Sequence, residues 1–356
     1  MRVERDTVEE PVHGVDDVNL TELRALVAAG GVVDIPAGVH VLDMTSTVGL
    51  NLSNVTLRGT PGATRLVFTG PAGEYRQMIA VGDNVTLEGL VVERAGLFNA
   101  IGVRVNPTTG VTIRQCQFVG GSAPSQPGFA HLFEAANNTG TTSHVRVARS
   151  TVSGWDYGWF QNNDAHGTVD GVVFDDCTFV GNFLTDLEFN APTGITRNVT
   201  VNNCRFHSTG SWGVGLARVA TASITGCTFA ARTPEAVHIE DGTTDALIQH
   251  CSFVTTGAHS VHVLSGSQRV KLADNTFDMS AAPADSAAVL ALYAINAPTA
   301  SGLPVGAPVV DLTMERNRQV GARASLFGFS VDGLRMVGNV GMDRVVIHNG
   351  SRVHIE

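Results

Sequence analysis

The chain has 356 residues, with 33 acidic and 23 basic side chains and a formal net charge of −10. It contains no run of basic residues, so a nucleic-acid partner is not expected, and no apolar stretch approaches the ~18–20 residues of a membrane span. Only 16 % of the residues are charged and 39 are glycine, a composition that suits short strands joined by tight corners.

Residues 1–17 are polar and charged, and we expect them to form a loose arm before the folded domain. They lack the apolar segment of a secretory signal peptide, so the expected location is the cytoplasm or a phage particle. The next segment, NLTELRALVAA at 19–29, has apolar residues at helical spacing. Asn19 and Glu22 stand three residues apart, as in a capping box, so a helix over 19–29 is predicted.

One short pattern recurs through the middle of the chain. Its clearest copy is NVTVNNCRF at 198–206, in which apolar and polar residues alternate, two polar residues follow, and Cys and Phe end the unit. The repeat places five cysteines in one row, at Cys116, Cys177, Cys204, Cys227 and Cys251. We predict that the five thiols are free and form a buried column. A metal site is not expected among them, because no CxxC pair or histidine cluster accompanies them.

The alternation within each copy indicates strands, and the two polar residues, such as Asn202 and Asn203, indicate a sharp corner between them. A second apolar alternation follows each cysteine, for example at Leu187 and Phe189. A period of about 20–50 residues is the signature of stacked repeats. The sequence therefore predicts one solenoid domain over 18–356, of about eleven coils, with a long insertion at 278–308.

The helix at 19–29, followed by GGVVDIPAG at 30–38 and the repeated copies, resembles the right-handed parallel β-helix of the pectate-lyase-like superfamily. The resemblance covers nearly the whole chain. It implies an all-β solenoid whose N-terminal helix closes one end, as in tailspikes and polygalacturonase-like enzymes. The superfamily includes polysaccharide lyases, glycoside hydrolases, fructan transferases, uronate epimerases and phage tailspikes, so the fold does not fix the reaction.

Carboxylates gather on the second strand of neighbouring coils. If the apolar residues of that strand point into the core, Asp186 and Glu188 point outward, and His238 and Glu240 follow two coils later. Cleavage of a glycosidic bond uses two carboxyl groups on either side of it. Glu188 is the predicted general acid, Asp186 or Glu240 would activate water or act as the nucleophile, and His238 would orient a carboxylate.

The three tryptophans lie in the same coils and are expected to stack on sugar rings. The predicted substrate-binding residues are Glu134, Trp155, Trp159, Gln161, Asp164, His166, Trp212, Arg218 and Asp241. Gly213 and Gly215 are expected to open a gap between the acids. Whether Trp159 or Phe160 faces outward stays open at this point, and His262 and His348 are expected to be ordinary surface residues.

The motifs of the uronate-specific branches are missing. The sequence lacks the NTD and RIK motifs of polygalacturonases and the Arg-x-Pro-x-x-Arg run of pectate lyases, and Lys271, its one lysine, lies away from the acids. An acidic cleft also disfavours polyanionic substrates.

We therefore predict a glycoside hydrolase or transglycosidase acting on a neutral oligo- or polysaccharide, without metal or other cofactor and without a membrane partner. One alternative is a non-catalytic, tailspike-like β-helix that binds glycans or is structural. Another is a polysaccharide lyase or uronate epimerase with a His or Arg base. A dimer or trimer is also expected, because the last coils lack an evident cap.

Overall fold

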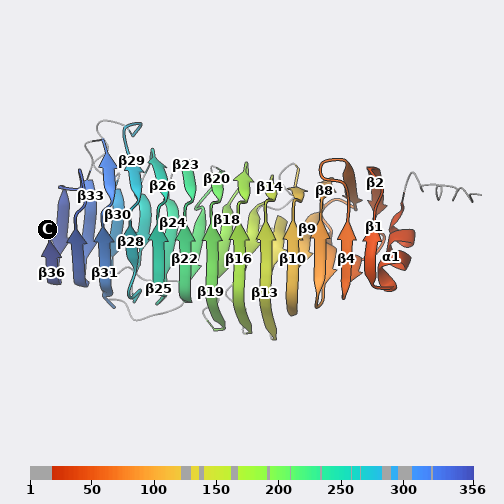
Figure 1. Cartoon of the computed structure of the whole chain (residues 1–356), viewed down its shortest axis with the longest axis horizontal. Coiled ribbons are helices and arrows are strands. Elements are labelled where there is room, and N and C mark those ends of the chain that lie inside the picture. The colour runs from red at the N-terminus through yellow and green to blue at the C-terminus, as the bar shows by residue number, and fades with distance from the viewer. Residues whose placement is uncertain are drawn as a thin grey trace, which may run out of the picture.

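The protein is described by a computed structural model. It covers residues 18–121, 130–135, 140–161, 167–190, 193–208, 210–232, 235–257, 259–264, 266–282, 290–295, 307–321 and 324–356. The predicted arm at 1–17 lies outside the described residues, as do Asp164 and His166. Within the described part, one helix and three parallel sheets wind along a single long axis (Figure 1).

Successive coils contribute strands to the three sheets in turn, so every hydrogen-bonded neighbour comes from an adjacent coil, and the second sheet ends before the other two. The first sheet has 13 described strands: β1 (Gly31–Asp34), β4 (Val55–Arg58), β7 (Val85–Glu88), β10 (Thr108–Arg114), β13 (Thr141–Ala148), β16 (Thr168–Asp175), β19 (Ile195–Asn202), β22 (Val219–Thr225), β25 (Thr244–Gln249), β28 (Lys271–Ala273), β31 (Val309–Glu315), β34 (Val331–Val337) and β36 (Ser351–Ile355). The second has 11 described strands: β2 (Gly38–Asp43), β5 (Thr64–Thr69), β8 (Leu90–Ala95), β11 (Gln117–Val119), β14 (Thr151–Ser153), β17 (Thr178–Val180), β20 (Arg205–His207), β23 (Thr228–Arg232), β26 (Ser252–Thr255), β29 (Thr276–Asp278) and β32 (Arg318–Val320). The third has 12 described strands: β3 (Val48–Leu52), β6 (Tyr75–Val81), β9 (Asn99–Arg104), β12 (Ala130–Glu134), β15 (Tyr157–Phe160), β18 (Thr185–Asn190), β21 (Val214–Ala217), β24 (Glu235–Glu240), β27 (His259–Val263), β30 (Leu290–Ile295), β33 (Ala324–Phe329) and β35 (Val345–His348).

The cysteine row forms the predicted interior column. All five cysteines are buried and free, and the backbone N–H of Cys177 donates to Sγ of Cys204 in the next coil at 3.4 Å. Asn275 continues the column, because its Oδ1 accepts from the backbone N–H of Cys251 at 2.9 Å. The corner before each of these positions has a left-handed backbone, with φ of 53° at Asp176 and 52° at Asn203. The prediction of stacked coils with Asn and Asp at the corners is confirmed.

The N-terminal end is covered by α1 (Leu20–Ala28), which lies beside β1 (Figure 1). The Asn19 side chain accepts from the backbone N–H of Glu22, whose side chain accepts from the backbone N–H of Asn19, so the predicted capping box is present. Leu23 and Val27 are buried against the first coil. The helix thus protects apolar core that the first coil alone would expose to water.

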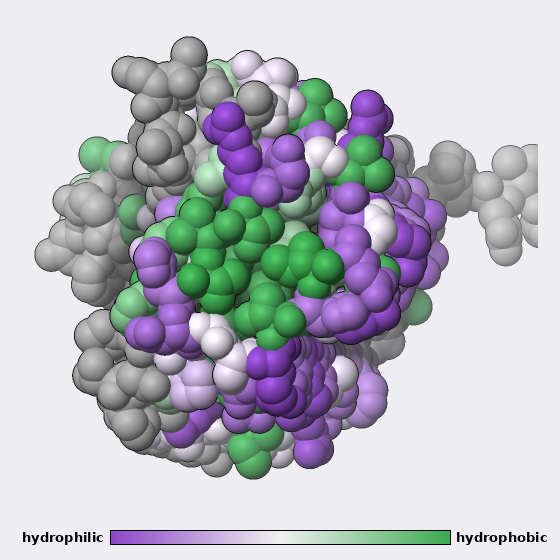
Figure 2. All heavy atoms as spheres, turned by 90° about the vertical axis from the view of Figure 1, so that its left-hand side faces the viewer, coloured by the Kyte–Doolittle hydropathy of each residue, from purple (hydrophilic) through white to green (hydrophobic). Residues whose placement is uncertain are grey.

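The opposite end presents apolar side chains. Seen from that side, hydrophobic residues gather at the centre of the last coils and hydrophilic residues ring them (Figure 2). Val346, Val353 and Ile355 of the last strands are exposed. The expected dimer or trimer stays a prediction.

One predicted boundary is wrong in part. Residues 290–295 were assigned to an insertion at 278–308 but form β30, a regular strand between β27 and β33. The Ala- and Pro-rich residues around this strand made its short apolar segment hard to recognise in the sequence.

No helix among the described residues is long and apolar enough to cross a membrane.

Candidate functional site

The outward side chains of the third sheet form one continuous line across the coils, which we call the outer row. Each member is the register partner of the next on the neighbouring strand. The outer row consists of Arg104, Glu134, Phe160, Glu188, Gly215, His238, His262, Tyr293 and Phe327. Residues far apart in the sequence therefore stand about 4.8 Å apart, strand to strand.

The third sheet does not follow strict alternation. Two consecutive residues are buried before each outer-row residue, such as Ala236 and Val237 before His238, so the residue three positions earlier also reaches the surface region. Glu235 and His238 meet in this way, with 2.5 Å between Oε2 and Nδ1. Sequence reasoning missed Glu235 because it assumed a period of two. The repeated spacings HxxE at 131–134, ExxH at 235–238 and HxxH at 259–262 carried the signal.

Glu188 is the most perturbed acid of the outer row. It is 8 % exposed, and the indole Nε1–H of Trp212 donates to its Oε2 at 2.5 Å. Burial raises the pKa of Glu188 to about 7, although the Trp212 hydrogen bond and His238 act in the opposite direction. A carboxyl group with this pKa is about half protonated at pH 7, so it can serve as a general acid.

His238 lies between two carboxylates. Its Nδ1 faces Glu235 and its Nε2 stands 3.5 Å from Oε2 of Glu240. Burial would lower the pKa of His238, but the hydrogen bonds with Glu235 and Glu240 outweigh burial and raise it to about 10. Burial likewise opposes ionisation of Glu235, but hydrogen bonds from His238 and His262 lower its pKa. The placement of His238 fits its predicted role of orienting a carboxylate.

Trp212 joins the two groups. Its ring stacks on the His238 ring with centroids 4.6 Å apart, while its N–H holds Glu188. A Cβ added at Gly215 would stand 2.4 Å from Nε1 of Trp212 and 2.8 Å from Oε2 of Glu188. The gap expected at Gly215 therefore exists, but these two side chains fill it. Gly213 is directed into the core instead, against the Phe229 ring.

Three predicted site residues are part of the core. Trp155 and Trp159 are fully buried, and the Trp159 ring stacks on Phe189 at 5.4 Å. The frame left open by the sequence is thereby settled, since Phe160 is the outward residue. Gln161 is also buried and donates to Oγ1 of Thr196 at 2.7 Å. Neither tryptophan can stack on a sugar, so that prediction is wrong.

Asp186 is also misplaced by the sequence prediction. It is fully buried, and its Oδ1 accepts from Nδ2 of Asn182 at 2.7 Å and from Oγ of Ser208 at 2.6 Å. It braces the chain around the start of β18 and cannot contact a glycan. Asp241 is buried in the turn after β24, and Arg218 is exposed at the corner after β21, so neither lies on the outer row.

Glu134 belongs to the outer row but forms a separate pair. Its Oε2 lies 2.7 Å from Nδ1 of His131, whose ring stacks on Phe160 at 3.9 Å.

His262, expected to be an ordinary surface residue, is instead 9 % exposed, with its Nδ1 2.9 Å from Oε1 of Glu235. That expectation is wrong, because Glu235 was not recognised beside it. His348 is exposed, as expected.

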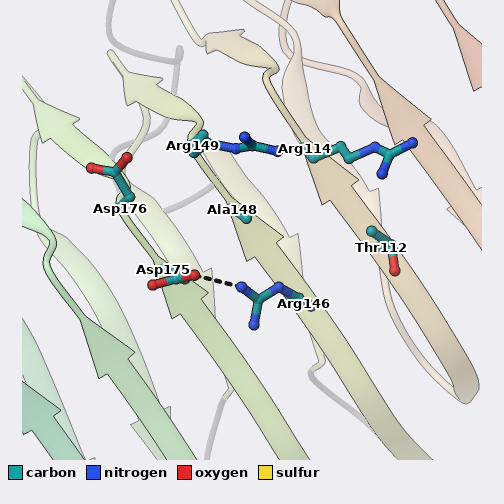
Figure 3. Close-up of a pocket in the computed structure, with 7 residues that line it drawn as sticks. All are labelled: Thr112, Arg114, Arg146, Ala148, Arg149, Asp175 and Asp176. Carbon is teal, nitrogen blue, oxygen red and sulfur yellow. Dashed lines mark hydrogen bonds and ion pairs between the residues drawn. The ribbon is translucent and has the colours of Figure 1, made fainter.

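Two hollows lie near charged or aromatic residues. One of about 360 Å³ adjoins the C-terminal part of the outer row, where His259, Tyr293 and Phe327 line it. A larger one of about 550 Å³ lies on the first sheet (Figure 3). There Arg146 pairs with Asp175, and Arg114 pairs with Glu88 on the neighbouring strand. Such exposed pairs are ordinary solvated surface, and of these two hollows only the smaller adjoins the outer row.

Comparison with known proteins agrees with this architecture. Residues 134–291 match the family described as right handed beta helix region. The mannuronan C-5 epimerase AlgE4 A-module of Azotobacter vinelandii superposes with a TM-score of 0.61 at 16 % identity, covering 96 % of this chain and 97 % of that chain. A tailspike protein of E. coli bacteriophage HK620, in complex with a pentasaccharide, gives a TM-score of 0.64 at 14 % identity. The match covers 93 % of this chain and 66 % of that chain.

No curated protein sequence matches the chain. At such low identities the likeness to solved structures concerns the fold alone. Together with the three stacked parallel sheets, these findings show that the chain folds as a right-handed parallel β-helix.

Proposed function

We propose that this protein is a carbohydrate-active enzyme that cleaves or transfers a glycosidic bond at the part of the outer row formed by Glu188, Trp212, His238 and Glu240. The observation that carries the proposal is the protonatable Glu188 carboxyl, facing the His238–Glu240 pair two strands away. Two proteins of the same fold are a mannuronan epimerase and a tailspike in complex with a pentasaccharide, which supports a glycan as ligand.

The roles follow from the surroundings of each acid. Glu188, with its pKa raised to about 7, keeps its proton below that pH and would give it to the leaving-group oxygen. Glu240 would activate water or act as the nucleophile, while His238 holds its carboxylate. Glu188 and His238 are aligned on strands two apart, about 9–10 Å by strand spacing, and Trp212 contacts both side chains between them.

The test is incubation of the full chain with a panel of neutral and acidic glycans. New reducing ends, or transfer products, are expected from a neutral glycan. Unsaturated uronate products would instead identify a lyase, and a changed uronate configuration an epimerase. Glycan binding without any product would identify a binding module and overturn the proposed catalysis.

Replacement of Gly215 by Ala is expected to reduce turnover by up to about tenfold while the protein stays folded. The new Cβ occupies the space of the Trp212–Glu188 hydrogen bond, and loss of one such bond to a protonated carboxyl group costs about 0.5–1.5 kcal/mol. Turnover and tryptophan fluorescence measure the change, because the other two tryptophans are buried. Gly70→Ala, whose added Cβ meets only ordinary contacts at 3.5 Å, is the control. Equal loss in both variants would contradict the prediction.

The raised pKa of Glu188 predicts a pH-dependent stability. Folding raises this pKa from 4.5 to about 7, so Glu188 stabilises the folded chain fully below about pH 4.5, and this contribution disappears as the pH rises through 7. The free energy of unfolding should fall by about 3 kcal/mol over that range. Urea denaturation of the wild type and of Glu188→Gln isolates the effect, because Tyr157, His238 and Glu240 face the carboxyl in both. Parallel pH curves for the two proteins would contradict it.

A further inference from the structure

We propose that Glu235, His259 and His262 form a binding site for one divalent transition-metal ion of the Zn²⁺ type. The three side chains come from two adjacent strands, with Glu235 and His259 as direct register partners and His262 three residues further along β27. One potential ligand atom from each lies within 4.8 Å of the others. Two imidazoles and a carboxylate are the donor set of several catalytic zinc sites and of non-haem iron sites.

The distances fit an ion held between these atoms. Oε1 of Glu235 lies 2.9 Å from Nδ1 of His262 and 3.8 Å from Nε2 of His259. Ligands about 2.05 Å from a tetrahedral zinc ion stand about 3.3 Å apart, between these two values. The third separation, between the ligand nitrogens of His259 and His262, is within 4.8 Å.

The carboxylate is already oriented for this role. His238 engages Oε2 of Glu235 at 2.5 Å, which leaves Oε1 turned toward the two histidines. Metal-binding carboxylates are usually fixed in this way by a second hydrogen-bonded partner. His238 itself is not a ligand, because its two ring nitrogens face Glu235 and Glu240.

His262 is well placed to act as a ligand. The residue is 9 % exposed, and its Nδ1 faces Oε1 of Glu235 at 2.9 Å, so Nδ1 is the atom that would bind the ion. The rings of His262 and His259 also pack on Tyr293, with centroids 5.1 and 4.6 Å away, which limits their rotation.

The site lies next to one of the two hollows. His259, one of the three proposed ligands, lines the hollow of about 360 Å³ together with Tyr293, so this hollow adjoins the proposed site. Sequence reasoning excluded a metal from the cysteine pattern alone and did not combine Glu235 with His259 and His262, which lie 24 and 27 positions after it.

Titration of the chelator-treated full chain with Zn²⁺ alone, followed by calorimetry, tests the site without any glycan and therefore independently of the proposed catalysis. One Zn²⁺ per chain is expected. His259→Ala, His262→Ala and Glu235→Gln should each weaken binding at least about 100-fold, more than loss of an orienting partner does. His348→Ala, an exposed histidine on the same sheet, should bind as the wild type does.

Titration of the wild type with Co²⁺ provides a readout that needs no variant to fold. Visible absorption bands of a four- or five-coordinate ion are expected, and Zn²⁺ should abolish them. Absence of these bands in the wild type, or Zn²⁺ binding no tighter than in His262→Ala, would overturn the proposal.

Discussion

Glu188→Gln should lower the turnover of a susceptible glycan by about 10²–10⁴-fold, the usual range for losing a general acid. Glutamine has nearly the same shape, and its amide oxygen can still accept from Nε1 of Trp212 at the present 2.5 Å. What is removed is the transferable proton, which burial keeps on Glu188 up to about pH 7. Initial rates at saturating and low substrate concentrations measure the loss.

Two further observations separate catalysis from simple disruption. The wild-type rate should decline as the pH rises past about 7, and this decline should be absent from the residual rate of Glu188→Gln. Glu93→Gln, on the second sheet and paired with Arg65, is the matched control and should keep full activity. A Glu188→Gln enzyme with more than a tenth of the wild-type rate would remove Glu188 from the mechanism.

The coil could be predicted from the sequence because its constraints repeat. The residues equivalent to Cys204 and Phe206 recur with the same spacing in successive copies. Their side chains stack from coil to coil and are buried together. The capping box of Asn19 and Glu22 depends on residues close together in the sequence, so it could also be predicted. The strand β30 was missed because its neighbours in the sequence share its Ala-rich composition.

The site was predicted less completely, because it depends on departures from the repeat. Strict alternation placed Asp186 outside and left Glu235 unnoticed, whereas the third sheet buries two consecutive residues in each coil. The same departure turns Trp159 inward and Phe160 outward. The register of strand pairing decides which residues of neighbouring coils contact one another. A shift of this register by one residue changes which side chains point outward along the whole strand.

The phenylalanine column should be the most sensitive part of the core. Phe206 stacks between Phe179 and Phe229, with ring centroids 5.0 and 4.7 Å away and ring planes within 4° of parallel. Phe206→Ala should lower the free energy of unfolding by about 3–5 kcal/mol, because both neighbouring rings lose contacts and a rigid sheet cannot close the cavity. Phe183→Ala, at a position 40 % exposed on the same coils, should cost less than about 1 kcal/mol. Urea unfolding followed by circular dichroism measures both, and equal effects would mean that the column does not stabilise the coil.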